Sequence, residues 1–499
     1  MWIIILTLLI VSVITYYLRK PNDFDKRGII YDKSLSISKT LGALFFRRIS
    51  IADMMTRIYD TKSDAKYIGS YFNGPLLVIR DPELIKIISI KHFDHFSYHK
   101  RYFDPDRDPF FGANLSALNG DKWRDMRTLL SPTFTSSKMK AMFKLMSACA
   151  KNFSDYIAKE TSEKPVIYNT KDAFTRYTTD VIATCAFGVE VDSMKHPDNE
   201  FYVLGKKAGV LKGFVKFKML LQMVVPIVMK ILGIHLLDRK IEKFFTDLVR
   251  NTIQTRDREG IVRPDMIQLL MDSRNNEKGL KLDIIDMTAQ AFVFFFGGFE
   301  TSSTIMCFLA HHIADDHQVQ RKLQEEIDEV WEACHGDLTY EAINRMEYLD
   351  AVVNECLRMY SITLGTDRIC TKEFELPPAL PGMQLVLVKP GEGLWFPIYA
   401  IHRDPKYFND PNKFIPERFI DHPRETLHSP AFIPFGSGPR MCIGNRFATL
   451  EIKVVIFYLM LKCSLRISDK MIMPLEFDKS NLNLGAEGGF WLDVMRRSK

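Results

Sequence analysis

A single cysteine lies in a loop rich in glycine, the stretch FGSGPRMCIG from Phe435 to Gly444. Glycines allow backbone conformations that other residues resist, and they let a backbone approach a flat, bulky group closely. Apolar residues recur with helical spacing after the loop, at Phe447, Leu450 and Val454. Cys442 is therefore expected at or just before a helix N-terminus, where the dipole favours a thiolate that could bind a metal. A buried cysteine beside an ordinary turn is the alternative.

A second candidate site lies in the apolar stretch AFVFFFGGFETSSTIM, where two glycines precede an acid and a hydroxyl. Gly297 and Gly298 each cost a helix about 1 kcal/mol relative to alanine, which indicates a reason such as room for a small ligand. Thr301 could then donate a hydrogen bond and Glu300 could relay protons from solvent. A loosely packed helix contact is the alternative.

Two further pairs have helical spacing. Trp123 and Arg127 in WRDMR are four residues apart, so an indole N–H and a guanidinium could reach carboxylates together. Glu355 and Arg358 in ECLR are three apart. This ion pair contributes little if it is exposed, but in a buried network the loss of one partner costs about 3 to 5 kcal/mol.

The elements that must position these residues are mostly helical. The chain has 499 residues, of which 46% are hydrophobic and 26% charged, enough for a large core. No repeat or Gly/Pro/Ser-rich linker divides it, so residues 36–499 are expected to form one catalytic unit that is mainly α with small β-sheets (α+β). Periodicity predicts helices at Ser137–Ala158, Ile284–Trp331 and Asn344–Tyr360, a hairpin within Ala65–Asp81, and strand material within Met383–Ile401.

The N-terminal sequence MWIIILTLLIVSVITYYLRK predicts a transmembrane anchor over residues 1–20, followed by a short linker over residues 21–35. No basic residue precedes the apolar run, which argues against a cleaved signal peptide. The basic residues that follow it place the remaining chain in the cytosol. Eight scattered cysteines without a CxxC agree with a reducing compartment. The net charge of +6 has no dominant basic run, which is poor support for nucleic-acid binding.

Residues 210–237 are strongly apolar but are broken by Gly213, Pro226 and Gly233 and carry four lysines. The lysines argue against a second membrane span. Two interpretations remain open. The segment is either a pair of core helices, or a mobile cover over a ligand cavity that dips into the membrane surface with its lysines at the headgroups.

The cysteine loop resembles that of a known family. Phe435, Gly438, Arg440, Cys442 and Gly444 match the F-x-x-G-x-R-x-C-x-G signature of the cytochrome P-450 monooxygenases. The motifs WRDMR, GGFETS, ECLR and PERF occur in the expected order, so the resemblance covers essentially the whole chain. It implies the cytochrome P-450 fold with an N-terminal transmembrane helix, and haem b as cofactor with Cys442 as the axial thiolate. Such a thiolate donates electron density that favours cleavage of the oxygen–oxygen bond.

The resemblance also implies roles for individual residues. Thr301 and Glu300 would be catalytic. Glu355, Arg358 and Arg418 would form a structural triad rather than a catalytic one. The haem would be bound by Trp123, Arg127, Arg368, Phe435, Arg440 and Cys442. The substrate would contact Phe110, Phe111, Val293, Phe296, Gly297 and Thr363, although core packing is an equal alternative for Phe110 and Phe111.

As a whole, the sequence resembles insect microsomal members of the family that oxidise plant toxins and insecticides. This implies a monooxygenase on the cytosolic face of the endoplasmic reticulum that acts on lipophilic small molecules. Electrons would come from an NADPH-dependent flavoprotein reductase, with cytochrome b5 as a further candidate donor. A basic face is expected to bind the acidic donor through Lys138, Lys140, Lys144, Arg446 and Lys453.

Two other functions remain open. A haem-thiolate enzyme that rearranges peroxides needs no reductase, but such enzymes typically lack the acid–threonine pair that Glu300 and Thr301 provide. A membrane-bound haem sensor would need neither a substrate cavity nor a proton relay. The sequence does not name the substrate, because a cavity is assembled from distant segments.

Overall fold

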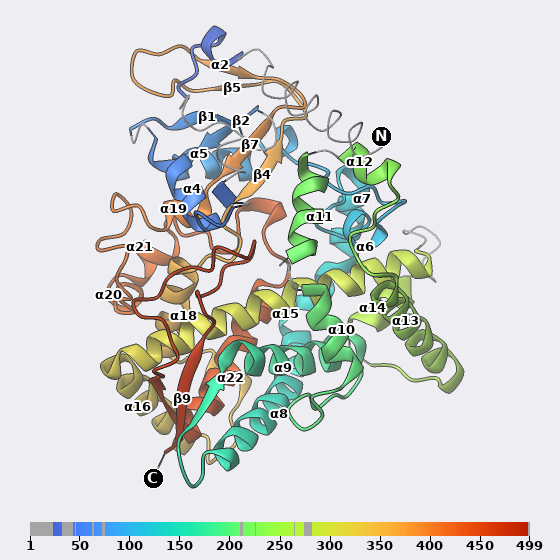
Figure 1. Ribbon diagram of the computed structural model, residues 1–499, viewed down its shortest axis with the longest axis vertical. Coiled ribbons are helices and arrows are strands. Elements are labelled where there is room, and N and C mark those ends of the chain that lie inside the picture. The colour runs from blue at the N-terminus through green and yellow to red at the C-terminus, as the bar shows by residue number, and fades with distance from the viewer. Residues whose placement is uncertain are drawn as a thin grey trace.

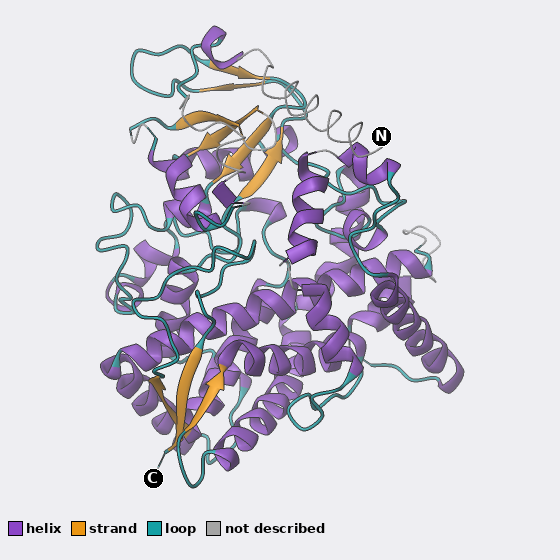
Figure 2. Ribbon diagram, viewed as in Figure 1, coloured by secondary structure: helices purple, strands orange, loops and turns teal. Residues whose placement is uncertain are grey.

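The computed structural model describes residues 23–31, 43–44, 46–61, 64–71, 75–209, 213–224, 226–263, 265–273 and 282–497. Figure 1 shows a small sheet region at the top and a helical body below it. The expected fold class, mainly α with small β-sheets, is confirmed (Figure 2). The predicted membrane anchor lies outside the described residues.

The helical body is built around α15, against which α9, α10, α13, α14, α16, α18 and α22 pack. Its main helices follow with their bounds. They are α7 (Gly120–Leu130), α8 (Ser136–Glu160), α9 (Thr170–Ile182), α10 (Glu200–Gly209), α11 (Gly213–Val224), α12 (Pro226–Ile231), α13 (Arg239–Glu259), α14 (Met266–Ser273), α15 (Ile284–Asp315), α16 (His317–Ala333), α18 (Glu347–Met359) and α22 (Asn445–Lys462). The remaining helical elements are α4, which has ten residues, and a set of short helical turns. These are α2 (Asp23–Lys26), α4 (Ile51–Asp60), α5 (Pro82–Lys86), η1 (Ile87–Lys91), η2 (Phe93–His95), α6 (Pro109–Gly112), η3 (Ser131–Phe134), η4 (Ala183–Phe187), α17 (Tyr340–Ile343), α19 (Ile398–Ile401), α20 (Arg418–Asp421), α21 (Pro423–Leu427) and η5 (Gly438–Arg440).

Three sheets are described. The largest has the order β1-β2-β7-β4, in which β2 and β7 run parallel and the other neighbours antiparallel. The order is β3-β9-β8 in the second sheet and β5-β6 in the third. Their bounds are β1 (Tyr67–Tyr71), β2 (Pro75–Ile79), β3 (Val166–Asn169), β4 (Thr366–Ile369), β5 (Phe374–Leu376), β6 (Val386–Val388), β7 (Gly393–Phe396), β8 (Cys463–Ile467) and β9 (Trp491–Arg496).

Most of the predicted elements are present. The hairpin predicted within residues 65–81 is the antiparallel pair β1 and β2, although its turn lies outside the described residues. The predicted helix 137–158 is α8, and the region 344–360 contains α18. The long helix predicted over 284–331 is wrong in one respect, because the chain breaks at Asp316. That residue adopts an extended conformation and its carboxylate accepts hydrogen bonds from the N–H groups of Gln318 and Val319, which starts α16 as a separate helix.

The longest helix, α15, runs through the middle of the body in Figure 1. Among the described helices it is the one long and apolar enough to cross a membrane, but 61% of its most apolar window is buried inside the protein. It packs against α9, α13 and α22. The helix is therefore the core of the fold, and the residues that interrupt its apolar surface are candidates for function.

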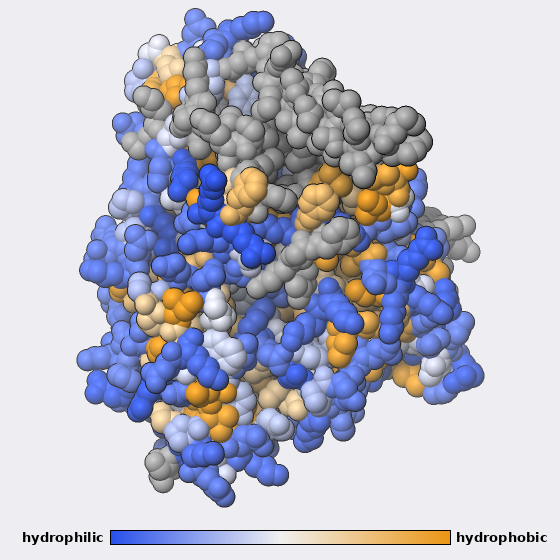
Figure 3. Space-filling model, viewed as in Figure 1, coloured by the Kyte–Doolittle hydropathy of each residue, from blue (hydrophilic) through white to orange (hydrophobic). Residues whose placement is uncertain are grey.

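The segment 210–237 combines features of both interpretations. Gln222 and Met229 are buried, whereas Ile227, Ile231 and Leu232 are 56%, 75% and 51% exposed. Figure 3 shows apolar side chains gathered over α11 and α12 in the upper right of the molecule. The exposed residues favour a surface-binding role, and the buried ones anchor the segment to the body.

The expectation that the lysines of this segment lie at the headgroups is wrong for Lys216. Its side chain is 7% exposed, and its ammonium donates to the carbonyl oxygens of Leu44, Lys479 and Ser480 at 3.3 to 3.4 Å. These carbonyls belong to segments far from α11 in the sequence. Lys230 remains exposed, as expected.

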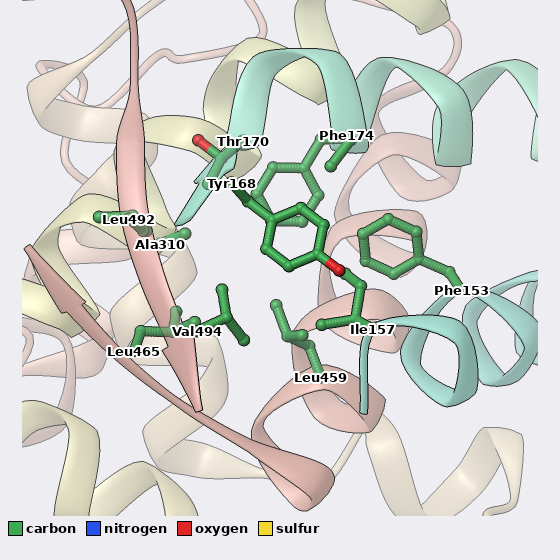
Figure 4. A pocket seen from close by; sticks show the side chains of 11 residues that line it. Phe153, Ile157, Tyr168, Thr170, Phe174, Ala310, Leu459, Leu465, Leu492 and Val494 are labelled. Atoms are coloured by element: carbon green, nitrogen blue, oxygen red, sulfur yellow. The ribbon is translucent and has the colours of Figure 1, made fainter. Parts of the chain in front are cut away.

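A small gap lies between α8, α9, α22 and the β3-β9-β8 sheet (Figure 4). It is lined by aromatic and aliphatic side chains, and its volume of about 10 Å³ is at the lower limit for one water molecule. The residues that line it include Phe153, Ile157, Tyr168, Phe174, Leu459 and Val494. None of them belongs to the predicted site, so the gap is a packing defect of the core.

Candidate active site

The loop that carries Cys442 is held by its own backbone and by close contact with η1. The Cys442 N–H donates to the Phe435 carbonyl at 2.9 Å, which closes the loop. Gly438 has a φ of +73°, and a Cβ built on it would lie 2.0 Å from the backbone oxygen of Ser89. No other residue fits this position, because both the conformation and the contact exclude a side chain.

Cys442 lies directly before α22 and is exposed. Desolvation by the surrounding protein raises the pKa of its thiol, and the Gly444 N–H and the charge of Arg127 lower it by less. A bound metal ion deprotonates a coordinating thiol, so iron bound here would favour the thiolate.

Arg440 lies beside this loop and is fixed by neutral partners. Its guanidinium donates to the carbonyls of Ser97 and Leu118 and to Asn119 Oδ1, each at 2.9 Å. It also stacks on the Trp123 ring, with its Cζ 3.9 Å from the ring centroid. Burial, followed by the charges of other basic groups, lowers the pKa of Arg440 to about 9.

Arg440 shares its surroundings with Arg368 and Arg127, whose charges act on it. Arg368 is 1% exposed, and its Nε has no hydrogen-bond partner within the described residues. Burial lowers its pKa to about 10. Asp367 is the carboxylate beside this group, and it also binds His99 Nδ1 at 3.0 Å. Three guanidinium groups thus lie in one region, and the Asp367 carboxylate acts on two of them, Arg368 and Arg440. This excess of positive charge suits an anionic ligand.

The GGFETS motif from Gly297 to Ser302, which carries the predicted catalytic residues, lies in the middle of α15. Gly297 is exposed although it lies in the core helix, and a Cβ built on it would meet no atom within 4 Å. Val293 and Thr301, one turn to either side, are partly exposed. The surface formed by Val293, Gly297 and Thr301 therefore borders open interior space. The Thr301 hydroxyl donates a hydrogen bond to the Gly297 carbonyl.

Glu300 is held by two residues that sequence reasoning missed. Its carboxylate lies 3.1 Å from Lys171 Nζ and accepts a hydrogen bond from Asn483 Nδ2 at 3.2 Å. Lys171 also donates to the hydroxyls of Ser303 and Thr304. Within the described residues no hydrogen bond joins Glu300 to Thr301. Nothing in the sequence marks Lys171 or Asn483, because they come from α9 and from the C-terminal loop.

The structure brings the expected triad together. Arg358 donates to both oxygens of Glu355 at 2.7 and 2.8 Å, and Arg418 Nε donates to Glu355 Oε1 at 3.0 Å. Glu355 and Arg358 are 0% exposed. Arg358 also donates to the carbonyls of His402 and Pro411. The triad therefore joins α18 to the chain that precedes the cysteine loop.

The substrate candidates separate into two groups. Phe110 is 2% exposed and packs on Phe292 with ring centroids 5.0 Å apart, so it belongs to the core. Phe111 and Phe296 are partly exposed, with centroids 5.6 Å apart. Thr363 is exposed in the loop between α18 and β4. The half-exposed aromatic pair next to Val293 and Gly297 gives this region an apolar wall.

The expected docking face is wrong for Lys453. This residue is 1% exposed and pairs with Asp350 at 2.6 Å. The reason is that α22 is buried on all sides from Leu450 to Leu461 rather than on one face. Lys140 and Lys144 are exposed on α8, and Lys140 pairs with Glu341.

The residues present fit a haem. The three guanidinium groups and Trp123 would bind its propionates, Cys442 would supply a thiolate ligand to its iron, and the Gly297 stretch of α15 would leave space beside it for a small ligand. When bound, the haem would supply the redox chemistry that activates oxygen, with the thiolate favouring cleavage of the oxygen–oxygen bond. The orphan Arg368 Nε and the excess of cations are the observations that support this fit.

Comparison with known proteins identifies the family of the chain. The sequence profile of the cytochrome P-450 family matches residues 67–490. The chain is 42% identical to cytochrome P-450 9e2 of Blattella germanica over 504 residues, which cover 95% of this chain and 94% of that protein. It is 34% identical to cytochrome P-450 9b2 of Drosophila melanogaster over 481 residues (95% and 94%) and to cytochrome P-450 6j1 of Blattella germanica over 480 residues (96% and 94%). Because the match extends over nearly the whole length and includes the Cys442 loop, the chain belongs to the cytochrome P-450 family.

Proposed function

We propose that the protein is a monooxygenase of the endoplasmic reticulum that inserts one oxygen atom from O₂ into lipophilic xenobiotics such as plant toxins or insecticides. The other oxygen atom leaves as water, with electrons from NADPH delivered by a flavoprotein reductase and protons delivered by the protein. The observation that carries the proposal is the combination of the Cys442 loop with an open, hydroxyl-bearing turn of α15 at Gly297 and Thr301.

Residues of α15 and of the neighbouring α6 have different roles. Val293 and Phe296 on α15 and Phe111 on α6 present apolar surface to a lipophilic substrate. The Thr301 hydroxyl holds a proton beside the open space. Glu300, bound to the partly exposed Lys171, connects this turn to the surface from which protons arrive.

Glu300 and Thr301 also distinguish a monooxygenase from the two alternative functions, a peroxide-rearranging enzyme and a haem sensor. A peroxide rearrangement consumes neither NADPH nor protons, so it would need neither Glu300 nor Thr301. A haem sensor would need no apolar substrate wall. Reductase-dependent NADPH consumption with formation of an oxidised product separates all three.

Replacing Thr301 by alanine tests the proposed reaction. With reductase, NADPH and an alkoxycoumarin as probe substrate, T301A is expected to consume NADPH while it releases hydrogen peroxide in place of product. The loss of one hydrogen-bonding hydroxyl at the reacting site corresponds to about 1 to 3 kcal/mol, so product per NADPH falls about fivefold to a hundredfold. The spectral binding constant of the substrate is expected to stay unchanged.

The matched control is T288A, which removes the same kind of hydroxyl from the same helix. Thr288 is buried and donates to the Ile284 carbonyl at 2.6 Å, but it lies more than three turns from Thr301. It is expected to leave coupling unchanged. Equal coupling in T301A and the wild type would remove Thr301 from the mechanism.

Membrane attachment is expected to involve α12 as well as the N-terminal segment. A protein that lacks residues 1–20 is expected to bind anionic vesicles at low salt, because Ile231 and Leu232 can insert beside the exposed Lys230. The double variant I231E/L232E should weaken binding in vesicle sedimentation by at least about tenfold. V262E is the control, since Val262 is 79% exposed on a different loop. A truncated protein that stays wholly in solution would show that α12 has no membrane role.

A further inference from the structure

Three side chains from two distant segments are placed so that a metal ion could bind between them. Asp108 lies directly before α6, His235 lies between α12 and α13, and Glu242 lies in the first turn of α13. One ligand atom of each side chain lies within 4.8 Å of the other two, and this is the one such group within the part of the chain that the structure describes. None of the three is among the residues predicted to bind haem or substrate.

The donor set is one imidazole and two carboxylates. This mixture suits a transition-metal ion such as Zn²⁺, whereas magnesium and calcium prefer oxygen ligands alone. The ligands of a tetrahedral zinc ion lie about 3.4 Å apart, given bonds of about 2.0 to 2.2 Å. His235 Nδ1 and Asp108 Oδ1 are already 3.8 Å apart. Small side-chain rotations would therefore complete the site.

The Asp108 carboxylate is buried and already oriented. Its side chain is 2% exposed, Arg107 Nε donates to its Oδ2 at 2.7 Å, and the Leu236 N–H donates to its Oδ1 at 3.1 Å. Carboxylates that bind metals are commonly fixed by such hydrogen bonds, and each oxygen keeps a further lone pair. The side chain of His235 is 31% exposed, so an ion can reach the site from solvent.

The two carboxyl groups lack a cation between them. Burial raises the pKa of Glu242, and the charge of His235 opposes this rise while that of Asp108 adds to it. The backbone carbonyl of Glu242 accepts a hydrogen bond from Thr246, but among the described residues its carboxyl group makes none. Arg107 neutralises Asp108 through the oxygen that Leu236 leaves free. A divalent cation would relieve the remaining repulsion.

The segments that would be joined already meet at this point. Arg107 donates to Gln222 Oε1 on α11 at 2.7 Å, and Gln222 Nε2 donates to the Tyr102 carbonyl at 2.6 Å. The Phe111 N–H donates to the Asp108 carbonyl at 3.1 Å. Asp108 is therefore tied through its backbone to the apolar wall, and an ion bound to its side chain would fix the start of α13 over that wall.

We propose that Asp108, His235 and Glu242 bind a divalent transition-metal ion, for which Zn²⁺ is the best fit, and that the bound ion clamps the loop before α6 to the start of α13 and so slows the entry and exit of lipophilic substrates. Binding of the ion does not depend on the proposed function, whereas its effect on substrate exchange does.

Zinc binding is tested with the full-length holoprotein after a chelator has removed loosely bound metal. Titration with zinc sulfate against a fluorescent zinc indicator should find one ion per chain, and millimolar magnesium should not displace it. H235Q and E242Q should each weaken the affinity at least about tenfold, the lower limit for losing even an outer partner of a metal ligand. Both variants should keep the reduced carbon monoxide spectrum of the wild type, which shows that the fold is intact.

H422Q is the matched control. His422 Nδ1 lies 3.8 Å from a carboxylate oxygen of Glu425, the same separation as between His235 and Asp108. These side chains are 71% and 84% exposed, and no third ligand among the described residues joins them. The affinity of H422Q for zinc should therefore equal that of the wild type.

Three further readouts locate the ion and its effect. X-ray absorption at the zinc edge should show imidazole nitrogen and carboxylate oxygen at about 2.0 to 2.2 Å and no sulfur. Zinc should slow hydrogen exchange in residues 98–112 and 226–242 of the wild type but not of H235Q. The spectral shift caused by the alkoxycoumarin should develop at least about fivefold more slowly with zinc, which corresponds to the lower end of coupling free energies between two sites.

Several results would overturn the proposal. Equal zinc affinity of the wild type, H235Q and E242Q would place the ion elsewhere, and a sulfur neighbour would assign it to a cysteine. Unchanged hydrogen exchange or an unchanged rate of the spectral shift would remove the clamp. Failure of the proposed function would look different: no variant would form product with reductase, while zinc binding and its effect on hydrogen exchange would remain.

Discussion

Replacing Cys442 by histidine is expected to abolish the red-shifted Soret band that a thiolate gives the ferrous carbon monoxide complex. Imidazole can bind iron, but it donates less electron density than a thiolate, so oxygen activation should also be lost. The loop geometry supports this expectation, because the hydrogen bond from the Cys442 N–H to the Phe435 carbonyl fixes the backbone at the cysteine. Reduced carbon monoxide difference spectra of purified C442H measure the band, and reductase-supported turnover measures the activity.

The other cysteines provide the control. Cys334 is partly buried at the end of α16, and C334A should keep both the band and the turnover. If C442H retains the red-shifted band, the axial ligand is one of the other cysteines. If C442H binds no haem, C442S separates loss of ligation from loss of the fold, since serine keeps the size of the side chain.

The second large effect concerns stability rather than chemistry. E355Q is expected to lower the free energy of unfolding by about 3 to 5 kcal/mol, because it leaves the buried Arg358 without a counter-charge and weakens the bond to Arg418. The amide oxygen of glutamine can still accept one hydrogen bond, but it cannot neutralise a guanidinium. Urea unfolding followed by circular dichroism measures the difference.

An exposed ion pair is the matched control for this loss. Lys322 and Glu417 lie 2.7 Å apart with side chains 44% and 37% exposed, so K322Q should change the free energy of unfolding by less than about 1 kcal/mol. An E355Q protein that is as stable as K322Q would show that the triad is not a structural network. Haem content measured in parallel would reveal whether the triad supports the cysteine loop.

Local spacing predicted the parts of the site that lie within one element. Trp123 and Arg127 share α7, and Glu355 and Arg358 share α18, as their spacings of four and three indicate. The cysteine loop and its following helix were also predicted from one continuous stretch. These features follow from helical periodicity alone, without any knowledge of distant segments.

Contacts between distant segments could not be predicted in this way. Lys453 fits the pattern of an exposed basic residue, but its burial depends on the helices that surround α22. The fate of Lys216 depends on carbonyl groups more than 170 residues away along the chain in one case and more than 260 in another. The desolvation that raises the thiol pKa of Cys442 likewise comes from the surrounding protein, which the helix position does not reveal.

The contact between Gly438 and the Ser89 carbonyl has a consequence for how the protein can vary. Gly438 allows the contact because it has no side chain, and Ser89 takes part in it only through its backbone oxygen. Position 438 therefore tolerates no replacement, whereas position 89 can change its residue type without loss of the contact. A comparison of residue identities would find the first position constrained and miss the second, although the two are equally necessary to seat the cysteine loop. Insertions in η1 should accordingly be far more damaging than substitutions there.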